Sequence, residues 1–446
     1  MYKSVFICTN CGYKSSKWLG RCPECQNWNS FTEELLIEKK AEAPLKKENK
    51  ISPVSVKSIK ADEINRFFTG IEEFDRVTGG ILKGQTILIS GEPGIGKSTL
   101  VIMITKNLSK HFRIFYVNGE ESNSQIKLKF VRLGINEENI FLLQDPVVEL
   151  IINEIENQKN CLLVIDSIQT IYSENVASLP GSLLQIRECV YQLVNICKNR
   201  DIPLILIGHI TKKGEIAGPK IIEHIVDSVF FLELDNRGVY RIIRALKNRF
   251  YKTDEIGIFS MEENGLVSQK EININPHDFE NGPGIVYYPH LEGSRVILTE
   301  VQALVSSSIL PYPKRICYGV ELNRFLMLIA IMEKKFKINL SKYDIYLNIT
   351  NGLNISDSAI DLSIIYSIYS SYKEKIIPST ISTIGEVGLS GEVRYIRNIS
   401  KRIKEAQRAG IKEFFIPYNQ KEDLRNNEIK IFPLKNIEEG IKLIFS

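Results

Sequence analysis

The fold is decided by the stretch Gly91-Glu92-Pro93-Gly94-Ile95-Gly96-Lys97-Ser98-Thr99, which follows an apolar run at Gln85–Ser90. Glycines in such a loop let backbone N–H groups close around phosphates, and the N-terminus of the following helix adds its dipole. Lys97 is expected to reach the outer phosphates, and Ser98 to hold magnesium. The whole stretch therefore predicts a nucleotide site on a strand–loop–helix unit.

Around this loop, short apolar runs alternate with helical stretches from Ile64 to about Ser268. This alternation is typical of an α/β domain, and nearly continuous apolar strands such as Leu162–Ile165 indicate a parallel sheet covered by helices on both faces. A hairpin at Asp235–Gly238 predicts an antiparallel edge. The expected strands are Gln85–Ser90, Phe112–Val117, Cys161–Ile165, Pro203–Ile207, Val229–Glu233 and Tyr240–Leu246.

Acidic residues follow two of these strands. Asp166 comes directly after Leu162–Ile165, where a carboxylate can hold magnesium beside a phosphate loop, although an aspartate there can also be only a helix cap. Glu120 and Glu121 follow Phe112–Val117. Because neighbouring side chains point to opposite sides, only one of these two carboxylates can face the outer phosphate as the catalytic base.

Two Cys-x-x-Cys pairs lie near the N-terminus, formed by Cys8, Cys11, Cys22 and Cys25. Two residues between the cysteines of a pair let both thiolates face one tetrahedral ion, and the second pair completes a four-sulfur site. A stretch this short has no core without metal, so zinc would supply its folding energy. A closed site leaves no position open for chemistry, so its role is structural, with a thiol redox pair or unbound cysteines as the alternative.

The loop between the two cysteine pairs combines cations with an aromatic ring: Lys14, Lys17, Trp18 and Arg21. Trp18 could stack on a base while the cations hold phosphate, or it could pack on the zinc knuckle. Whether this module contacts DNA or protein therefore stays open.

Length and composition indicate several domains of an ordinary globular kind. The chain has 446 residues, of which 43% are hydrophobic and 25% charged. We expect no membrane span and no secretory signal, and the paired cysteines suit a reducing compartment. The predicted divisions are a zinc finger at 1–32, a charged linker at 33–60, the nucleotide-binding α/β domain at 61–270 and an α+β domain at 271–446.

The last of these domains is expected to mix strands and helices. Strands are predicted at Ser294–Val301 and Tyr343–Ile349, and helices at Ser358–Tyr369 and Ile399–Ala409.

Along nearly its whole length the chain resembles the bacterial RadA (Sms) family of recombination and repair proteins. The resemblance implies a RecA-like ATPase core with an N-terminal zinc finger and a C-terminal domain like that of Lon protease. The stretches that carry it are Thr69–Gly80, Gly91–Thr99, Tyr116–Ser122, Gly208–Lys212, Ile216–Pro219, Lys247–Phe250, Glu300–Val305 and Gly385–Leu389.

The resemblance implies roles at individual positions of the ATP site. Glu120 takes the position of the RecA-type catalytic glutamate, which favours it over Glu121. His209 ends a strand and would sense the γ-phosphate of ATP, with a buried structural histidine as the alternative. Lys97 and Asp166 complete the catalytic set, and Asp166 and Ser98 would hold Mg²⁺.

Two segments take the positions of the DNA-binding loops of RecA-like proteins, Tyr172–Ser182 and Thr211–Lys220. In the second segment, Lys212, Lys213 and Lys220 lie between glycines. That composition can follow a phosphate backbone, so these lysines are the predicted DNA contacts.

The run Lys247–Phe250 resembles a Lys-Asn-Arg-Phe-Gly motif that is diagnostic of the family. Lys247 and Arg249 lie two residues apart at the end of a predicted strand and would project to the same face. They suit a finger that reaches into the site of a neighbouring subunit, and a solvated basic edge is the alternative. Tyr251 stands where the family has glycine.

The last domain resembles the Lon protease fold without its catalytic residues. Ala359 falls on the position of the nucleophilic serine, and a register slip by one would offer Ser358 instead. The position of the catalytic lysine falls on Ser400, with Lys401 beside it. A basic surface for DNA or for assembly is expected from Arg394, Arg397, Lys401, Arg402 and Lys404.

The resemblance as a whole implies a cytoplasmic, DNA-dependent ATPase of recombinational repair that uses ATP, Mg²⁺ and Zn²⁺. It would form a homohexamer, bind single-stranded and branched DNA, act with a RecA-type recombinase filament and promote branch migration. The alternatives are a nucleotide-switched regulatory assembly and an ATP-dependent protease.

Overall fold

The computed structural model describes residues 2–8, 13–37, 55, 65–209, 222–235, 238–269, 282–309, 312–350, 353–420 and 429–445. The chain divides into two compact units, Met1–Leu234 with Val239–Gln269 and Asp235–Gly238 with Lys270–Ser446. None of the described helices combines the length and the apolar character needed to cross a bilayer.

The N-terminal module is a small antiparallel sheet in the order β2-β1-β3, built from β1 (Tyr2–Cys8), β2 (Lys14–Ser15) and β3 (Phe31–Ile37). A tight turn follows β2, in which the Cys22 N–H donates to the Asn27 carbonyl and the Gln26 N–H to the Cys22 carbonyl, both at 2.9 Å. Among the side chains that the structure describes here, the buried apolar cluster consists of Cys8, Cys22 and Phe31, with Phe6, Leu19 and Cys25 packed against it. So small a core agrees with a module whose stability depends on a bound metal.

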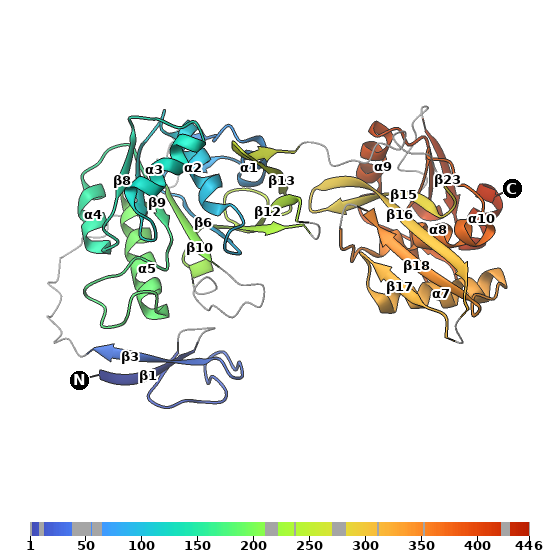
Figure 1. The fold of residues 1–446 in the computed structure, drawn as a ribbon, viewed down its shortest axis with the longest axis horizontal. Coiled ribbons are helices and arrows are strands. Elements are labelled where there is room, and N and C mark those ends of the chain that lie inside the picture. Colours follow the sequence, from blue (N-terminus) through green and yellow to red (C-terminus); the bar gives the residue numbers. More distant parts are fainter. Residues whose placement is uncertain are drawn as a thin grey trace. The chain divides into compact units, whose positions relative to one another are not determined.

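The nucleotide-binding part of the first unit is a nine-stranded sheet in the order β14-β13-β12-β11-β6-β10-β9-β7-β8 (Figure 1). The strands from β11 to β8 run parallel, and β12, β13 and β14 continue the sheet antiparallel. Their bounds are β6 (Thr86–Gly91), β7 (Arg113–Asn118), β8 (Ile140–Leu143), β9 (Cys161–Asp166), β10 (Leu204–His209), β11 (Ser228–Leu234), β12 (Tyr240–Asn248), β13 (Ile256–Glu262) and β14 (Gly265–Ser268).

Helices cover both faces of this sheet, as the apolar strands predict. Alternate residues of β6 enter different cores: Ile87 and Ile89 pack with α2 and α3, whereas Leu88 packs with α4 and α5. The helices are α1 (Glu72–Thr78), α2 (Lys97–Leu108), α3 (Asn123–Arg132), α4 (Val148–Glu156) and α5 (Leu183–Asn199). Two short strands, β4 (Arg66–Phe67) and β5 (Ile81–Leu82), pair with each other as a separate two-stranded sheet.

All six strands expected in this part are present, and their observed ends differ from the predicted ends by at most two residues. The antiparallel edge at the hairpin after β11 is confirmed. Three strands of the nine-stranded sheet were not expected, β8, β13 and β14, nor was the short pair β4 and β5. The four residues of β8 are all only half-buried, so a short edge strand shows neither the continuous burial nor the alternation that marks a strand.

The second unit is a seven-stranded sheet in the order β17-β18-β16-β15-β19-β22-β23, with a separate hairpin β20–β21. The strands are β15 (Ile285–Glu292), β16 (Arg295–Ser307), β17 (Arg315–Tyr318), β18 (Tyr343–Ile349), β19 (Ile381–Thr383), β20 (Glu386–Val387), β21 (Val393–Arg394), β22 (Glu413–Pro417) and β23 (Lys430–Leu434). The helices are α7 (Leu322–Phe336), a 3-10 turn η4 (Ser358–Ile360), α8 (Asp361–Lys373), α9 (Ile399–Arg408) and α10 (Ile437–Phe445). The α+β class expected here is therefore correct.

The core of the second unit is built around α8, whose side chains are buried on nearly every side from Asp361 to Ser371. The helix expected from Ser358 begins as the 3-10 turn and becomes α-helical at Asp361. This turn contains Ser358 and Ala359, the positions that were compared with the nucleophile of a protease.

Candidate nucleotide site

The phosphate loop joins the buried strand β6 to α2, with Gly96 as the N-cap of the helix. None of the described side chains caps α2, so the first backbone N–H groups of the helix are directed toward the loop, as a phosphate site requires. A Cβ on Gly91 would lie 2.2 Å from the Leu232 carbonyl oxygen, so only glycine fits where the loop passes β11. The observed geometry matches that expected for Gly91–Thr99.

Lys97 lies inside this loop. Its Nζ donates to the carbonyls of Gly91 at 2.9 Å and Glu92 at 2.8 Å, and the residue is 3% exposed. Burial lowers the pKa of Lys97 to about 8, although the carboxylates of Asp166 and Glu120 favour the charged form. None of the described carboxylates forms an ion pair with this ammonium, so a phosphate entering the loop would be its natural counter-ion.

Asp166 ends β9, and the hydroxyl groups of Tyr116 and Ser98 lie near its carboxylate. Burial raises the pKa of Asp166, and these two hydroxyl groups oppose the rise. A hydroxyl and a carboxylate within reach of each other are the oxygen donors that Mg²⁺ prefers, so these two residues fit a magnesium ion. When bound there, the ion would neutralise charge on the β- and γ-phosphates.

The structure distinguishes the two adjacent glutamates. Glu120 Oε1 accepts a hydrogen bond from Ser167 Oγ at 2.6 Å and lies 3.5 Å from His209 Nε2. Glu121 instead forms an ion pair with Lys129 at 2.7 Å. Glu120 is therefore grouped with the ends of β9 and β10, whereas Glu121 is occupied by a lysine of α3, which favours Glu120 as the base.

Three residues of this site were not predicted from the sequence. Ser167 holds Glu120, Asn118 Oδ1 accepts from the backbone N–H groups of Glu120 and Glu121 at 3.3 and 3.4 Å, and Tyr116 Oη donates to Asp166 Oδ2 at 2.6 Å. Strand alternation provides a signal for the tyrosine. Asn118 pairs with Asp166 across the sheet, so Tyr116, two residues earlier, lies on the same face as the aspartate.

The hydroxyl of Tyr116 is expected to orient Asp166 toward magnesium. Tyr116→Phe keeps the ring in the core but removes the hydrogen bond. Loss of a partner to a metal ligand typically costs 10- to 100-fold in metal affinity, and we expect about that increase in the Mg²⁺ concentration needed for binding of a fluorescent ATP analogue. Tyr366→Phe is the matched control, because that buried hydroxyl donates to a carbonyl in the other unit. An unchanged Mg²⁺ dependence in Tyr116→Phe would contradict the role.

Lys247 and Arg249 both turn toward the segment Glu223–Asp227 of their own chain. Lys247 Nζ donates to the carbonyls of Glu223 and Val226 at 2.7 Å. Arg249 lies 3.3 Å from Asp227 and its side chain is 53% exposed. Both side chains therefore lie on the same side of the chain, as two residues two positions apart on a strand are expected to. Only the Arg249 side chain is half-exposed, so Arg249 is the better candidate for a finger.

Tyr251 adopts no left-handed backbone conformation, since it is absent from the described residues with positive φ. Its ring lies against Gly79, where a Cβ would be 2.4 Å from the ring, and the Arg66 guanidinium is 6.0 Å from the ring centroid. Arg66 also donates to the carbonyls of Gly79 and Phe250 at 2.8 and 2.9 Å. The turn after the motif therefore accommodates tyrosine in place of the family glycine.

Of the two predicted DNA-binding segments, the first is described and the second is not. Tyr172–Ser182 is tied to α5 through Gln185, whose Nε2 donates to the carbonyls of Ser173 and Ser178 at 3.1 and 3.0 Å. Lys212, Lys213 and Lys220 lie outside the described residues.

The cysteine cluster of the N-terminal module forms a metal-binding geometry. The sulfur atoms of Cys8, Cys22 and Cys25 all lie within 4.8 Å of one another, and Cys11 lies outside the described residues. The described cysteines form no disulfide. Converging thiols on two turns are the donor set of a zinc ribbon.

Zinc is expected at about one per chain. Cys8→Ser combined with Cys25→Ser should remove it, because two thiolate ligands are lost, and metal analysis of the purified protein checks this. Cys317→Ser, a half-buried cysteine in the second unit, is the control that should keep full zinc content. Equal zinc in both variants would exclude the site.

The second unit places no serine–lysine pair at the positions compared with a protease. Ala359 is buried at the nucleophile position, and the hydroxyl of Ser358 donates to Glu386 Oε2 at 2.6 Å, a carboxylate instead of a lysine. Ser400 is exposed at the first turn of α9. We therefore expect no ATP-stimulated peptide cleavage. Cleavage that is abolished by Ser358→Ala would refute this expectation.

The expectation that Arg402 belongs to a basic surface is wrong. Arg402 is 3% exposed, and its guanidinium donates to Tyr288 Oη at 2.8 Å and to the Pro289 carbonyl at 3.0 Å and pairs with Asp357. Burial opposes ionisation of Asp357, but the Arg402 guanidinium outweighs it and holds the pKa of that carboxyl below its usual value. Helical periodicity explains the error, since Arg402 lies on the buried side of α9 and Lys401 on the exposed side.

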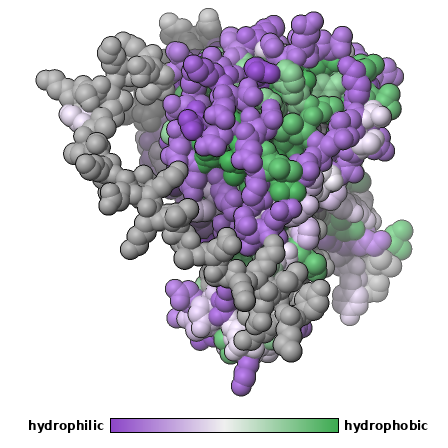
Figure 2. All heavy atoms as spheres, turned by 90° about the vertical axis from the view of Figure 1, so that its left-hand side faces the viewer, coloured by the Kyte–Doolittle hydropathy of each residue, from purple (hydrophilic) through white to green (hydrophobic). Residues whose placement is uncertain are grey.

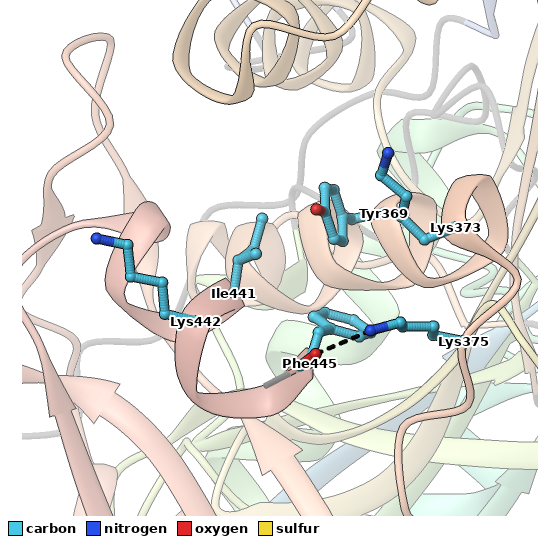
Figure 3. Close-up of a pocket in the computed structure, with 6 residues that line it drawn as sticks. All are labelled: Tyr369, Lys373, Lys375, Ile441, Lys442 and Phe445. Carbon is cyan, nitrogen blue, oxygen red and sulfur yellow. Dashed lines mark hydrogen bonds between the residues drawn. The ribbon is translucent and has the colours of Figure 1, made fainter.

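A hollow of about 440 Å³ between the end of α8 and α10 is lined by three lysines and two aromatic rings (Figure 3). Lys375 Nζ donates to the Phe445 carbonyl at 2.9 Å, which satisfies the end of α10. The amino groups of Lys373 and Lys442 point away from each other (Figure 3). Cations that do not converge bind no common anion, so this hollow belongs to the packing of the helix ends.

Three known protein families match separate segments of the chain. Residues 6–33 match the family described as rubredoxin metal binding domain, residues 82–212 the AAA domain, and residues 323–420 subunit ChlI of Mg-chelatase.

Relatives match along the whole chain. It is 41% identical over 449 residues to DNA repair protein RadA of Aquifex aeolicus, with 99% of each chain covered. Identity to DNA repair protein RadA of Bacillus subtilis is 39% over 454 residues, covering 99% of this chain and 98% of the relative. The protein of that name from Helicobacter pylori strain 26695 is 42% identical over 421 residues, covering 93% and 94%.

Among solved structures, a KaiC-like protein from Pyrococcus horikoshii matches 46% of this chain and 99% of its own, with 23% identity and a TM-score of 0.39.

Proposed function

This chain belongs to the DNA repair protein RadA family, and from that membership we propose that it is a DNA-dependent ATPase of recombinational repair. It would act in the cytoplasm on single-stranded and branched DNA, with a RecA-type recombinase filament, and promote branch migration of recombination intermediates. ATP hydrolysis would drive the movement.

The observation that carries the proposal is the position of Glu120. Its carboxylate is held by Ser167 and lies 3.5 Å from His209 Nε2, at the end of β10. The chain continues from His209 into the predicted DNA-binding segment Thr211–Lys220. A shift of that segment on binding DNA would therefore be transmitted to the catalytic base through a single neighbouring side chain.

The geometry supports the chemistry that we assign to each residue. The loop N–H groups and Lys97 bind and orient the phosphates of ATP. Glu120 accepts a proton from the attacking water at Oε1 or Oε2, and His209 adjusts the position of that carboxylate. Asp166, oriented by Tyr116, would hold the magnesium together with Ser98.

Assembly into a ring would cover apolar surface of the first unit. Figure 2, which views the side on which Figure 1 draws α4 and β8, shows an apolar area amid hydrophilic surface. The edge strand β8 is half-exposed along its length, and Leu128, Val131 and Leu150 of the neighbouring helices are at least 50% exposed. Apolar edges of this kind favour association, which supports the proposed homohexamer.

The test is the ATPase rate of the full chain with and without single-stranded DNA. A motor should hydrolyse ATP faster with DNA, whereas a nucleotide-switched regulatory assembly should show the same slow rate in both conditions. Lys97→Ala, which leaves the β- and γ-phosphates without their ammonium, should abolish turnover and so exclude a contaminating ATPase. A DNA-independent rate in the wild-type protein would sink the proposed function.

A further inference from the structure

The N-terminal module exposes two tryptophan rings on one surface. Trp18 is 53% exposed and Trp28 is 71% exposed. Both rings flank Gly20, because a Cβ on this glycine would lie 3.7 Å from the Trp18 ring and 4.0 Å from the Trp28 ring. Trp18, Gly20 and Trp28 are called the tryptophan surface below. Trp18 is therefore not buried on the zinc knuckle, one of the two interpretations that the sequence leaves open.

The zinc ribbon holds this surface in place. Arg21 and Trp28 pair as an antiparallel bridge, and the Asn29 N–H donates to the Gly20 carbonyl at 2.8 Å. The paired residues Arg21 and Trp28 flank the turn that contains Cys22 and Cys25. Metal binding at these cysteines would therefore fix the backbone next to both tryptophans. A rigid backbone beneath the rings lowers the entropic cost of binding a ligand on them.

Cations are frequent in the segment that carries the rings. Lys14, Lys17 and Arg21 are exposed, and Glu24 is the single carboxylate between residues 13 and 32. The Arg21 guanidinium lies 5.7 Å from the centroid of the Trp28 ring, and its Nε and Nη2 donate to Gln26 at 3.0 and 2.7 Å. Large apolar rings left in water favour a ligand that covers them, and the charge around them selects an anionic one.

We infer that the tryptophan surface stacks unpaired bases of single-stranded DNA while Lys14 and Lys17 contact its phosphates. Every base has a π-face, so stacking on tryptophan works for any sequence, and adjacent cations follow the backbone. Duplex DNA would not bind in this way because its bases are already stacked. The inference rests on the proposed function, since it assigns a second contact to the same DNA.

The chain offers a direct probe, because Trp18 and Trp28 are its only two tryptophans. Tryptophan fluorescence of the full-length protein therefore reports this surface alone. Titration with oligo(dT) is expected to quench the fluorescence, and an abasic oligonucleotide of equal length, which has phosphates without bases, is expected not to. Trp18→Phe and Trp28→Phe each leave one reporter and should both retain quenching.

Affinity is measured separately with the double variant Trp18→Ala and Trp28→Ala. Stacking of a base predicts about tenfold weaker binding of oligo(dT) for each ring removed. Unchanged zinc content of the variant shows that the module still folds, because neither ring contributes a ligand.

The outcomes separate this inference from the proposed function. If oligo(dT) stimulates the ATPase but leaves the fluorescence and the affinity of the double variant unchanged, the inference is overturned and the function stands. That result is the one expected if the surface docks a protein. Equal quenching by the abasic strand would also overturn it, because phosphate contact alone would then explain the signal. If oligo(dT) neither binds to the protein nor stimulates its ATPase, both the inference and the proposed function are overturned.

Discussion

Glu120→Gln is expected to bind ATP as the wild-type protein does and to hydrolyse it about 10²- to 10⁴-fold more slowly. The amide cannot accept a proton from water, but its carbonyl oxygen can still accept the hydrogen bond from Ser167 Oγ, which spans 2.6 Å in the native site. The loop around Lys97 is untouched. Binding is measured with a fluorescent ATP analogue and hydrolysis by phosphate release.

Glu121→Gln is the matched control, since it changes the neighbouring carboxylate in the same way. Its ion pair with Lys129 is about one-third exposed on both sides, so its loss should cost little stability and little rate. Normal hydrolysis by Glu120→Gln together with a large loss in Glu121→Gln would show that the wrong carboxylate has been chosen.

Arg249→Ala is expected to lower hydrolysis by about 10³- to 10⁵-fold while each protomer still binds ATP, if the arginine acts as a finger in the neighbouring site. The structure makes this a clean substitution. Asp227, which lies 3.3 Å from Arg249, keeps its ion pair with Lys198 at 2.8 Å and its hydrogen bond from Thr86 Oγ1 at 2.7 Å. Asp227 is therefore not left unpaired when Arg249 is removed.

Lys247→Ala is a less selective test of the same idea. Lys247 Nζ donates hydrogen bonds to the carbonyls of Glu223 and Val226 within its own chain. A loss of activity in Lys247→Ala would therefore combine a local structural defect with any role of the lysine in the site of a neighbouring subunit. Tyr251→Gly complements it, and an unchanged rate would show that the motif works with tyrosine at this position.

A mixture of Arg249→Ala and Lys97→Ala proteins distinguishes a finger from a solvated basic edge. In mixed rings, some boundaries pair an intact phosphate loop with an intact Arg249, so part of the activity should return. A basic edge predicts little loss in Arg249→Ala and no rescue. Absence of rescue in rings shown to be mixed would count against action across the boundary.

Local sequence by itself determined the outline of the protein. The phosphate loop, the six apolar strands around it and the paired cysteines could be assigned because each is a short-range pattern whose spacing reflects backbone geometry or a coordination sphere. The class of each domain followed from the same periodicities. Elements without such a pattern were missed, as the half-buried edge strand β8 shows.

Only the tertiary structure decided which side chains meet. Strand alternation alone does not separate Glu120 from Glu121, and only the family resemblance favours Glu120. In the structure the two differ because Ser167 and His209 lie beside Glu120 while Lys129 pairs with Glu121. Tyr116 reaches Asp166 from a neighbouring strand, across 50 positions of the chain. Arg402 lies on the buried side of α9, and the partners that it meets there, Tyr288 and Asp357, are also distant in sequence. Contacts between distant residues depend on strand order and register, which a linear pattern does not contain.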